Sequence, residues 1–134
     1  MNKSYTILVI DDMVDIQDIL TYRLSKLGYR VFSGSNGQEA VELAKEHVPN
    51  LILMDLSMPV MDGTQATRTI RADPALAHIP IIALSGHIDK EDRDMLLEAG
   101  FNDLWTKPMK VKLLVENINR WLNPDVNLVG GDEY

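Results

Sequence analysis

The chain has 134 residues, the length of one ordinary domain, and its lack of cysteine excludes disulfides, thiolate nucleophiles and cysteine-based metal sites. Its net charge of −7 and scattered basic residues argue against direct nucleic-acid binding. Hydrophobic residues make up 46% of the chain, but no apolar run approaches the about 20 residues that a membrane helix requires, so we expect a folded, cytoplasmic protein without membrane insertion.

Strand-like and helix-like patterns alternate five times along the sequence. Short apolar runs closed by polar or turn residues are typical of buried strands, and apolar residues three and four apart are typical of helices packed on a sheet. The predicted strands are 5–10, 30–33, 51–54, 81–84 and 103–106. The predicted helices are 14–27, a segment between the Asn36-Gly37 turn and Pro49, 63–71, 90–99 and 110–122.

The first and last predicted helices have the clearest apolar stripes. Gly28 and Pro124 mark their C-terminal ends. In the first helix the apolar residues at helical spacing are Ile16, Ile19, Leu20, Leu24 and Leu27. In the last helix the residues expected to face inward are Val111, Leu114, Val115, Ile118 and Leu122.

Five alternating strand–helix units imply a parallel sheet with helices on both faces, because parallel connections require crossovers. We therefore expect an α/β fold, a flavodoxin-like doubly wound sheet of five strands in the order 2-1-3-4-5 with five helices. No linker or change in composition marks a second domain, so residues 1–123 are predicted to form one domain. Residues 124–134 are predicted to form a short, acidic, flexible tail.

Polar residues follow four of the apolar runs, at the point where each predicted strand ends. The first run is followed by Asp11 and Asp12, the third by Asp55, the fourth by Ser85 and the fifth by Lys107. In open α/β sheets ligands bind at the carboxyl ends of the strands, and strands one and three are neighbours in the expected order. The sequence therefore predicts one site built from these five residues.

The predicted site has the parts that phosphoryl transfer requires. Three carboxylates at close range repel one another, and a hard divalent cation such as Mg²⁺ relieves that repulsion. Lys107 would add a mobile positive charge, and Ser85 a hydroxyl donor. Charge neutralisation and positioning are the main demands of phosphoryl transfer. Asp55 is then the natural nucleophile, and its attack on phosphorus would give an acyl phosphate.

Each of these residues, taken alone, has a simpler interpretation. Asp11 and Asp12 could cap the first helix, and Asp55 could be a turn residue at the end of a strand. Ser85 before a glycine could be a turn serine, and Lys107 could be a solvated surface lysine. None of these interpretations accounts for the other residues, so the combination favours a site.

Four motifs at the strand ends carry a resemblance to a known family. They are Ile-Asp-Asp at 10–12, Met-Asp-Leu-Ser-Met-Pro-Val-Met-Asp-Gly at 54–63, Leu-Ser-Gly at 84–86 and Thr-Lys-Pro at 106–108. With these four motifs in this order, the chain resembles a response-regulator receiver domain of two-component signalling, similar to the single-domain chemotaxis regulators. The resemblance extends from about Tyr5 to Leu122.

The resemblance implies a role for each acidic residue. Asp55 corresponds to the phospho-acceptor, and Asp12 to a direct Mg²⁺ ligand. Asp11 is implied to act on the metal through water, and the backbone carbonyl of Ser57 to supply a further ligand.

The resemblance also implies a switching mechanism. Ser85 corresponds to the switch hydroxyl that turns toward the phosphoryl group, and Lys107 to the lysine that pairs with it. The Lys107-Pro108 bond is implied to be cis. Where the family usually has an aromatic switch residue, three positions before the lysine, this chain has Leu104 followed by Trp105. For Trp105 we expect a packing role, with a partner surface as the alternative.

The function implied is that of a stand-alone signalling switch, not of a metabolic enzyme, although it would catalyse its own phosphorylation and autodephosphorylation. A histidine kinase or histidine phosphotransfer protein would phosphorylate Asp55. The face formed by the fourth helix, fifth strand and fifth helix would then shift and control a downstream protein. The chain would act as a monomer or as a phosphorylation-dependent dimer.

Three alternatives remain open on the sequence. A hydrolase of the haloacid-dehalogenase kind also uses an aspartate and Mg²⁺, but it needs a second acid where this chain has Ser57. A flavodoxin-type flavin carrier needs a phosphate loop where Asp11 and Asp12 would repel phosphate. The chain could also be a receiver cut from a hybrid kinase or larger regulator.

Overall fold

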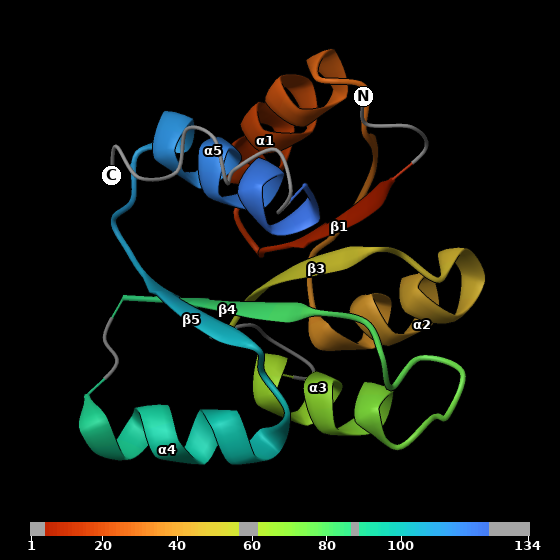
Figure 1. Ribbon diagram of the computed structural model, residues 1–134, viewed down its shortest axis with the longest axis vertical. Coiled ribbons are helices and arrows are strands. Elements are labelled where there is room, and N and C mark those ends of the chain that lie inside the picture. Colours follow the sequence, from red (N-terminus) through yellow and green to blue (C-terminus); the bar gives the residue numbers. More distant parts are fainter. Residues whose placement is uncertain (1–4, 57–61, 87–88, 124–134) are drawn as a thin grey trace.

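The computed structural model describes residues 5–56, 62–86 and 89–123, in which five strands and five helices alternate (Figure 1). Their bounds lie within one or two residues of those predicted from the sequence. The elements are β1 (Thr6–Ile10), α1 (Val14–Lys26), β2 (Arg30–Gly34), α2 (Gly37–His47), β3 (Leu51–Asp55), α3 (Gly63–Arg71), β4 (Ile81–Ser85), α4 (Lys90–Ala99), β5 (Asp103–Thr106) and α5 (Val111–Leu122). The predicted tail, 124–134, lies outside the described residues.

The strands form one parallel sheet in the order β2-β1-β3-β4-β5, which confirms the predicted topology. The register pairs Ile10 with Met54, and Asp55 with Leu84. Ser85 pairs with Thr106. The carboxyl ends of β1, β3, β4 and β5 are therefore level with one another, and the polar residues that follow them lie along one edge of the sheet.

Helices cover both faces of the sheet, with α1 and α5 on one face and α2, α3 and α4 on the other (Figure 1). Alternate side chains of each strand enter two separate cores. On β1, for example, Ile7 and Val9 pack toward α1 and α5, whereas Leu8 and Ile10 pack toward the opposite layer. Because both faces of β1 are buried, its sequence is a continuous apolar run rather than an alternating one.

The apolar stripe of α1 is narrower than the sequence predicted. Leu20 and Leu24 are fully buried, but Ile19 and Leu27, which share the apolar spacing, are 43% and 42% exposed. The third buried residue of α1 is Gln17, one turn before Leu20. Neighbouring helical positions differ by about 100°, so Ile19 points away from the sheet that Leu20 faces.

The ends of the helices follow the local signals in the sequence. Gly28 ends α1 with a left-handed φ of 99°, as predicted. Asn36, Asp62 and Asp89 each accept a backbone N–H in the first turn of α2, α3 and α4. None of the helices in the described part of the chain combines the length and apolarity needed to cross a membrane.

A buried hydroxyl in α3 gives a first prediction. The Thr67 side chain is completely buried, and its Oγ1 has no hydrogen-bond partner among the described residues. A buried hydroxyl without a partner carries an uncompensated desolvation cost, and valine keeps the shape of threonine without the hydroxyl. We expect Thr67→Val to raise the free energy of unfolding by about 1 kcal/mol. Urea unfolding would measure it; a destabilised variant would show that the hydroxyl has a partner in solution.

Candidate functional site

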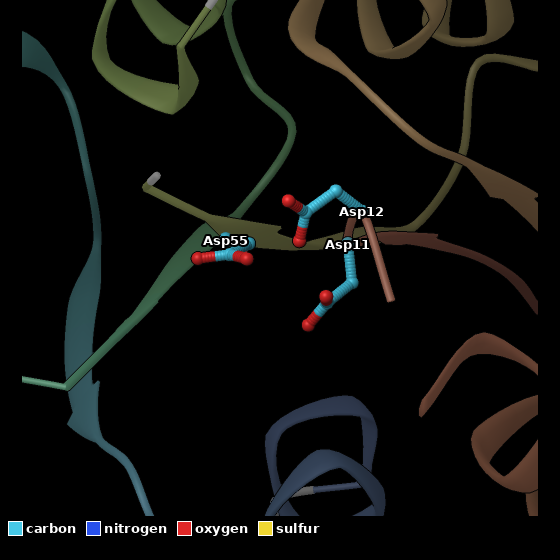
Figure 2. Close-up of side chains that lie close together, drawn as sticks. All are labelled: Asp11, Asp12 and Asp55. Carbon is cyan, nitrogen blue, oxygen red and sulfur yellow. The ribbon is translucent and has the colours of Figure 1, made fainter. Parts of the chain in front are cut away.

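Three carboxylates converge at the carboxyl edge of the sheet. Asp11 and Asp12 follow β1, and Asp55 is the last residue of the neighbouring strand β3. One oxygen from each carboxylate lies within 4.8 Å of the others, and Figure 2 shows the three side chains around a common space. Asp11 and Asp55 are buried, whereas Asp12 is exposed. The cluster is therefore open to solvent on the side of Asp12.

Lys107 supplies the positive charge in this cluster. Its Nζ lies 3.3 Å from Oδ2 of Asp55 and 3.6 Å from Oδ2 of Asp11. The lysine follows β5, whereas the two carboxylates come from β1 and β3. Two buried carboxylates at this range repel each other, and the ammonium between them offsets that repulsion.

The donor set fits a hard divalent cation. Three carboxylates and one ammonium leave two negative charges in the cluster, and all the available ligand atoms are oxygen. Mg²⁺ and Ca²⁺ prefer oxygen ligands, and Mg²⁺ commonly uses only a few carboxylates together with water. Ser57, whose backbone carbonyl was expected to be a further ligand, lies outside the described residues.

Ser85 and Lys107 are held next to each other by the backbone. The N–H of Lys107 donates to the carbonyl of Ser85, at 2.6 Å. Ser85 is partly exposed and ends β4, beside the strand that carries Asp55. The Lys107-Pro108 peptide bond is cis, as the family resemblance implied. All the predicted site residues that the structure describes therefore lie at one edge of the sheet.

The two acidic residues after β1 do not cap α1. Met13 occupies the N-cap position, and no side chain in the described part of the structure caps this helix. Instead, Oδ1 of Asp11 accepts the backbone N–H of Met13, at 2.9 Å. This bond turns the chain between β1 and α1 and leaves Oδ2 of Asp11 facing Lys107. The capping interpretation is therefore wrong for both residues.

Gln17 supports the site and was missed by the sequence analysis. Its side-chain amide donates to the carbonyl oxygens of Asp11 and Gly34 and to Oγ of Ser35. It thereby fixes the backbone after β1 against the end of β2. A polar residue one turn before the buried Leu20 was the available signal, because a buried amide needs hydrogen-bond partners.

Gly63 is a second supporting residue that the sequence analysis did not single out. A Cβ at this position would lie 2.4 Å from the carbonyl oxygen of Asp55 and 2.9 Å from Cγ of Met54. The first turn of α3 therefore packs directly against the backbone that carries the Asp55 carboxylate. Only glycine allows this approach without a shift of the backbone.

We expect Gly63→Ala to destabilise the protein by about 3 kcal/mol and to weaken divalent-cation binding, because the clash is with backbone next to Asp55. Thermal unfolding with and without Mg²⁺ would measure both effects. Gly86→Ala is the matched control, since a Cβ at Gly86 would meet none of the described residues within 4 Å. Equal stability of the two variants would contradict the close packing of α3 on β3.

An apolar cavity of about 220 Å³ adjoins the carboxylates, between α1 and α5. Asp11 and Lys107 line it together with apolar side chains that include Ile16 and Met109. Met13, at the rim, is 55% exposed, and Val14 is 59% exposed. Apolar surface therefore lies next to the charged groups, on the side of α1.

The position of the family's aromatic switch residue is buried here. Leu104 is 6% exposed and belongs to the core under α4, with Leu96 and Phe101. Trp105 points to the other core, toward α5, as expected of a packing residue. The indole N–H groups of Trp105 and Trp121 donate to the same oxygen of Asp103, at 3.1 and 3.4 Å.

Known proteins are similar to this chain in both sequence and fold. A family model for the response regulator receiver domain matches residues 7–119. The chain is 36% identical over 115 residues to an uncharacterized 14.6 kDa protein of Leptolyngbya boryana, covering 86% of this chain and 88% of that protein. It is 32% identical over 122 residues to the polar-differentiation response regulator DivK of Brucella anthropi, covering 91% and 98%.

A solved structure shows the same likeness. The receiver domain of a sensor histidine kinase from Pseudomonas aeruginosa, with magnesium coordinated in its active-site cleft, superposes with a TM-score of 0.78 at 38% identity, covering 90% of this chain and 98% of that one. Receiver domains act as signalling switches in two-component systems and bind Mg²⁺ at an acidic pocket. With its matching sequence, topology and aspartate cluster, this chain belongs to the response regulator receiver domain family.

Proposed function

We propose that this chain is a phosphorylation-controlled switch in which Asp55 accepts a phosphoryl group from a phosphohistidine donor. The observation that carries the proposal is the convergence of Asp11, Asp12 and Asp55, with the Lys107 ammonium 3.3 Å from Asp55. The family assignment disfavours the hydrolase and flavin-carrier alternatives.

In the proposed reaction an oxygen of Asp55 attacks the phosphorus of the donor. The new O–P bond forms as the P–N bond of phosphohistidine breaks, and the released imidazole nitrogen takes up a proton. Asp12, Asp55 and the carbonyl of Ser57, with Asp11 acting through water, would hold Mg²⁺, whose charge would neutralise that of the phosphoryl oxygens. Asp12, being exposed, lies on the side where donor and metal enter.

Lys107 and Ser85 would respond to the product. Asp55 loses its negative charge at the bonded oxygen, and the phosphoryl oxygens become the stronger partners of the Lys107 ammonium. The Ser85 hydroxyl would donate to another phosphoryl oxygen. Because Ser85 and Lys107 share a short backbone hydrogen bond, movements of β4 and β5 at this edge would be coupled.

The partners we propose are a histidine kinase or histidine phosphotransfer protein as donor and a downstream protein as target, all in the cytoplasm. The exposed Met13 and Val14, beside the cavity between α1 and α5, offer the donor an apolar surface next to the acceptor. The target would contact the surface of α4, β5 and α5. Residues 1–123 would form the whole switching domain.

The experiment that tests the proposal is the intact mass of the protein after incubation with Mg²⁺ and acetyl phosphate. One Mg²⁺-dependent phosphoryl adduct per chain supports it. Absence of an adduct with acetyl phosphate and with phosphorylated histidine proteins would contradict it.

A further inference from the structure

One side chain at the opposite edge of the sheet joins several elements. Arg71, the last residue of α3, donates from Nε to the carbonyl of Gly100, at 2.9 Å, and from Nη2 to Oδ1 of Asn102, at 2.7 Å. Its Nη1 donates to the carbonyls of Ala77 and Ile79, at 3.0 and 2.8 Å. A single guanidinium thus connects α3 and the segment before β4 to the segment between α4 and β5.

Asn102 extends this connection into the sheet. The oxygen that accepts from Arg71 also accepts the backbone N–H of Ile81, at 2.8 Å. The backbone N–H of Asn102 donates in turn to the carbonyl of Ile81, at 2.8 Å. The entry to β5 is therefore tied to the first residue of β4, at the edge of the sheet remote from Asp55.

Gly100 fits this arrangement in two independent ways. It ends α4 with a left-handed φ of 119°, which favours glycine. A Cβ there would also lie 2.7 Å from Cγ of Arg71. The arginine stem thus lies against the C-terminal end of α4 while its guanidinium holds the Gly100 carbonyl.

The packing of α4 is uneven along its length. Its buried residues are Leu96 and Ala99, both in the second half. Residues 90–95 contribute no buried side chain, and Met95 is 49% exposed. A helical segment with few buried contacts opens at low free energy, whereas a packed and hydrogen-bonded one does not. The first half of α4 is also the half nearer in sequence to Ser85.

We infer that Arg71 is a positioning residue that fixes the C-terminal end of α4, so that α4 responds to the phosphorylation of Asp55 only through residues 90–95. The inference rests on the proposed function and specifies how its output surface moves. The site acts on the β4 end that leads into α4, and the Arg71 contacts prevent a shift of the whole helix. Leu104, buried beneath α4 against Leu96, remains in place during this change.

Hydrogen exchange of the unphosphorylated protein tests the fixed end. In the wild type we expect the amides of residues 97–102 to exchange at least about tenfold more slowly than those of residues 93–95, after correction for intrinsic rates. Arg71→Lys keeps the charge but loses the planar fork of donors, so it should abolish most of this difference. Arg68→Lys is the control, because Arg68 lies on the same helix and is exposed. Equal protection of both halves in the wild type would overturn the inference.

The second part of the experiment compares hydrogen exchange before and after the protein is treated with acetyl phosphate and Mg²⁺. Intact mass confirms the adduct. We expect the exchange of residues 90–95 to change and that of residues 97–102 to stay constant. In Arg71→Lys, which phosphorylates normally because Arg71 is remote from Asp55, the change should extend into residues 97–102. With the adduct present, a wild-type change spread over the whole helix would overturn the inference alone. Absence of an adduct with acetyl phosphate and with phosphorylated histidine proteins would overturn the proposed function and the inference with it.

Discussion

Asp55→Asn is expected to take up no phosphoryl group under conditions in which the wild-type chain is fully modified. The amide is neutral and a poor nucleophile, so the O–P bond cannot form at this position. The fold should tolerate the change, because the substitution removes one of two buried negative charges that share the Lys107 ammonium. Intact mass after treatment with Mg²⁺ and acetyl phosphate measures uptake, and thermal unfolding shows that the variant is folded.

Asp62→Asn provides the matched control for this experiment. Asp62 is an exposed acid before α3, and its Oδ1 caps the backbone N–H of Gln65. Asparagine caps a helix as well as aspartate does, so this variant should keep both stability and phosphoryl uptake. An adduct on Asp55→Asn, located by fragmentation at another carboxylate, would move the acceptor away from β3 and contradict the proposal.

The fold could be predicted because its signals are local and agree with one another. Continuous apolar runs such as residues 51–54 predicted strands buried on both faces, and Gly28 marked the end of the first helix. Alternation of strands and helices then left few topologies, because parallel connections have a fixed hand. The carboxyl ends of the strands followed from that topology, which is why Asp11, Asp55 and Lys107 could be expected to lie together.

The residues that were missed depend on contacts distant in sequence. Nothing near Gln17 indicates that it reaches Gly34, and nothing near Gly63 indicates that α3 starts against the carbonyl of Asp55. Ile19 shares the apolar spacing of α1 and is nevertheless exposed, because periodicity gives the direction of a stripe but not its width. The width is set by how α1 lies on the sheet, which is a tertiary property.

We expect Lys107→Met to lower both the stability of the protein and the rate of phosphoryl uptake. The variant leaves Asp11 and Asp55 buried without their shared cation, so we expect the free energy of unfolding at neutral pH to fall by about 2 kcal/mol in the absence of metal. Loss of one stabilising group for the transferring phosphoryl should slow adduct formation by about a hundredfold. Chemical unfolding and the time course of intact mass measure the two effects.

Added Mg²⁺ should reverse most of the stability loss in Lys107→Met. Whether Mg²⁺ stabilises this variant more or less than the wild type tests whether the ammonium and the metal share one cluster. A positive charge 3.3 Å from Asp55 opposes a cation in the same cluster, so its removal strengthens metal binding. A ligand that binds the folded state stabilises it in proportion to its affinity, so Mg²⁺ should raise the melting temperature of Lys107→Met more than that of the wild type. Lys110→Met, which removes an exposed lysine near the start of α5, should behave like the wild type. A smaller Mg²⁺ effect in Lys107→Met than in the wild type would show that the ammonium and the metal do not share one cluster.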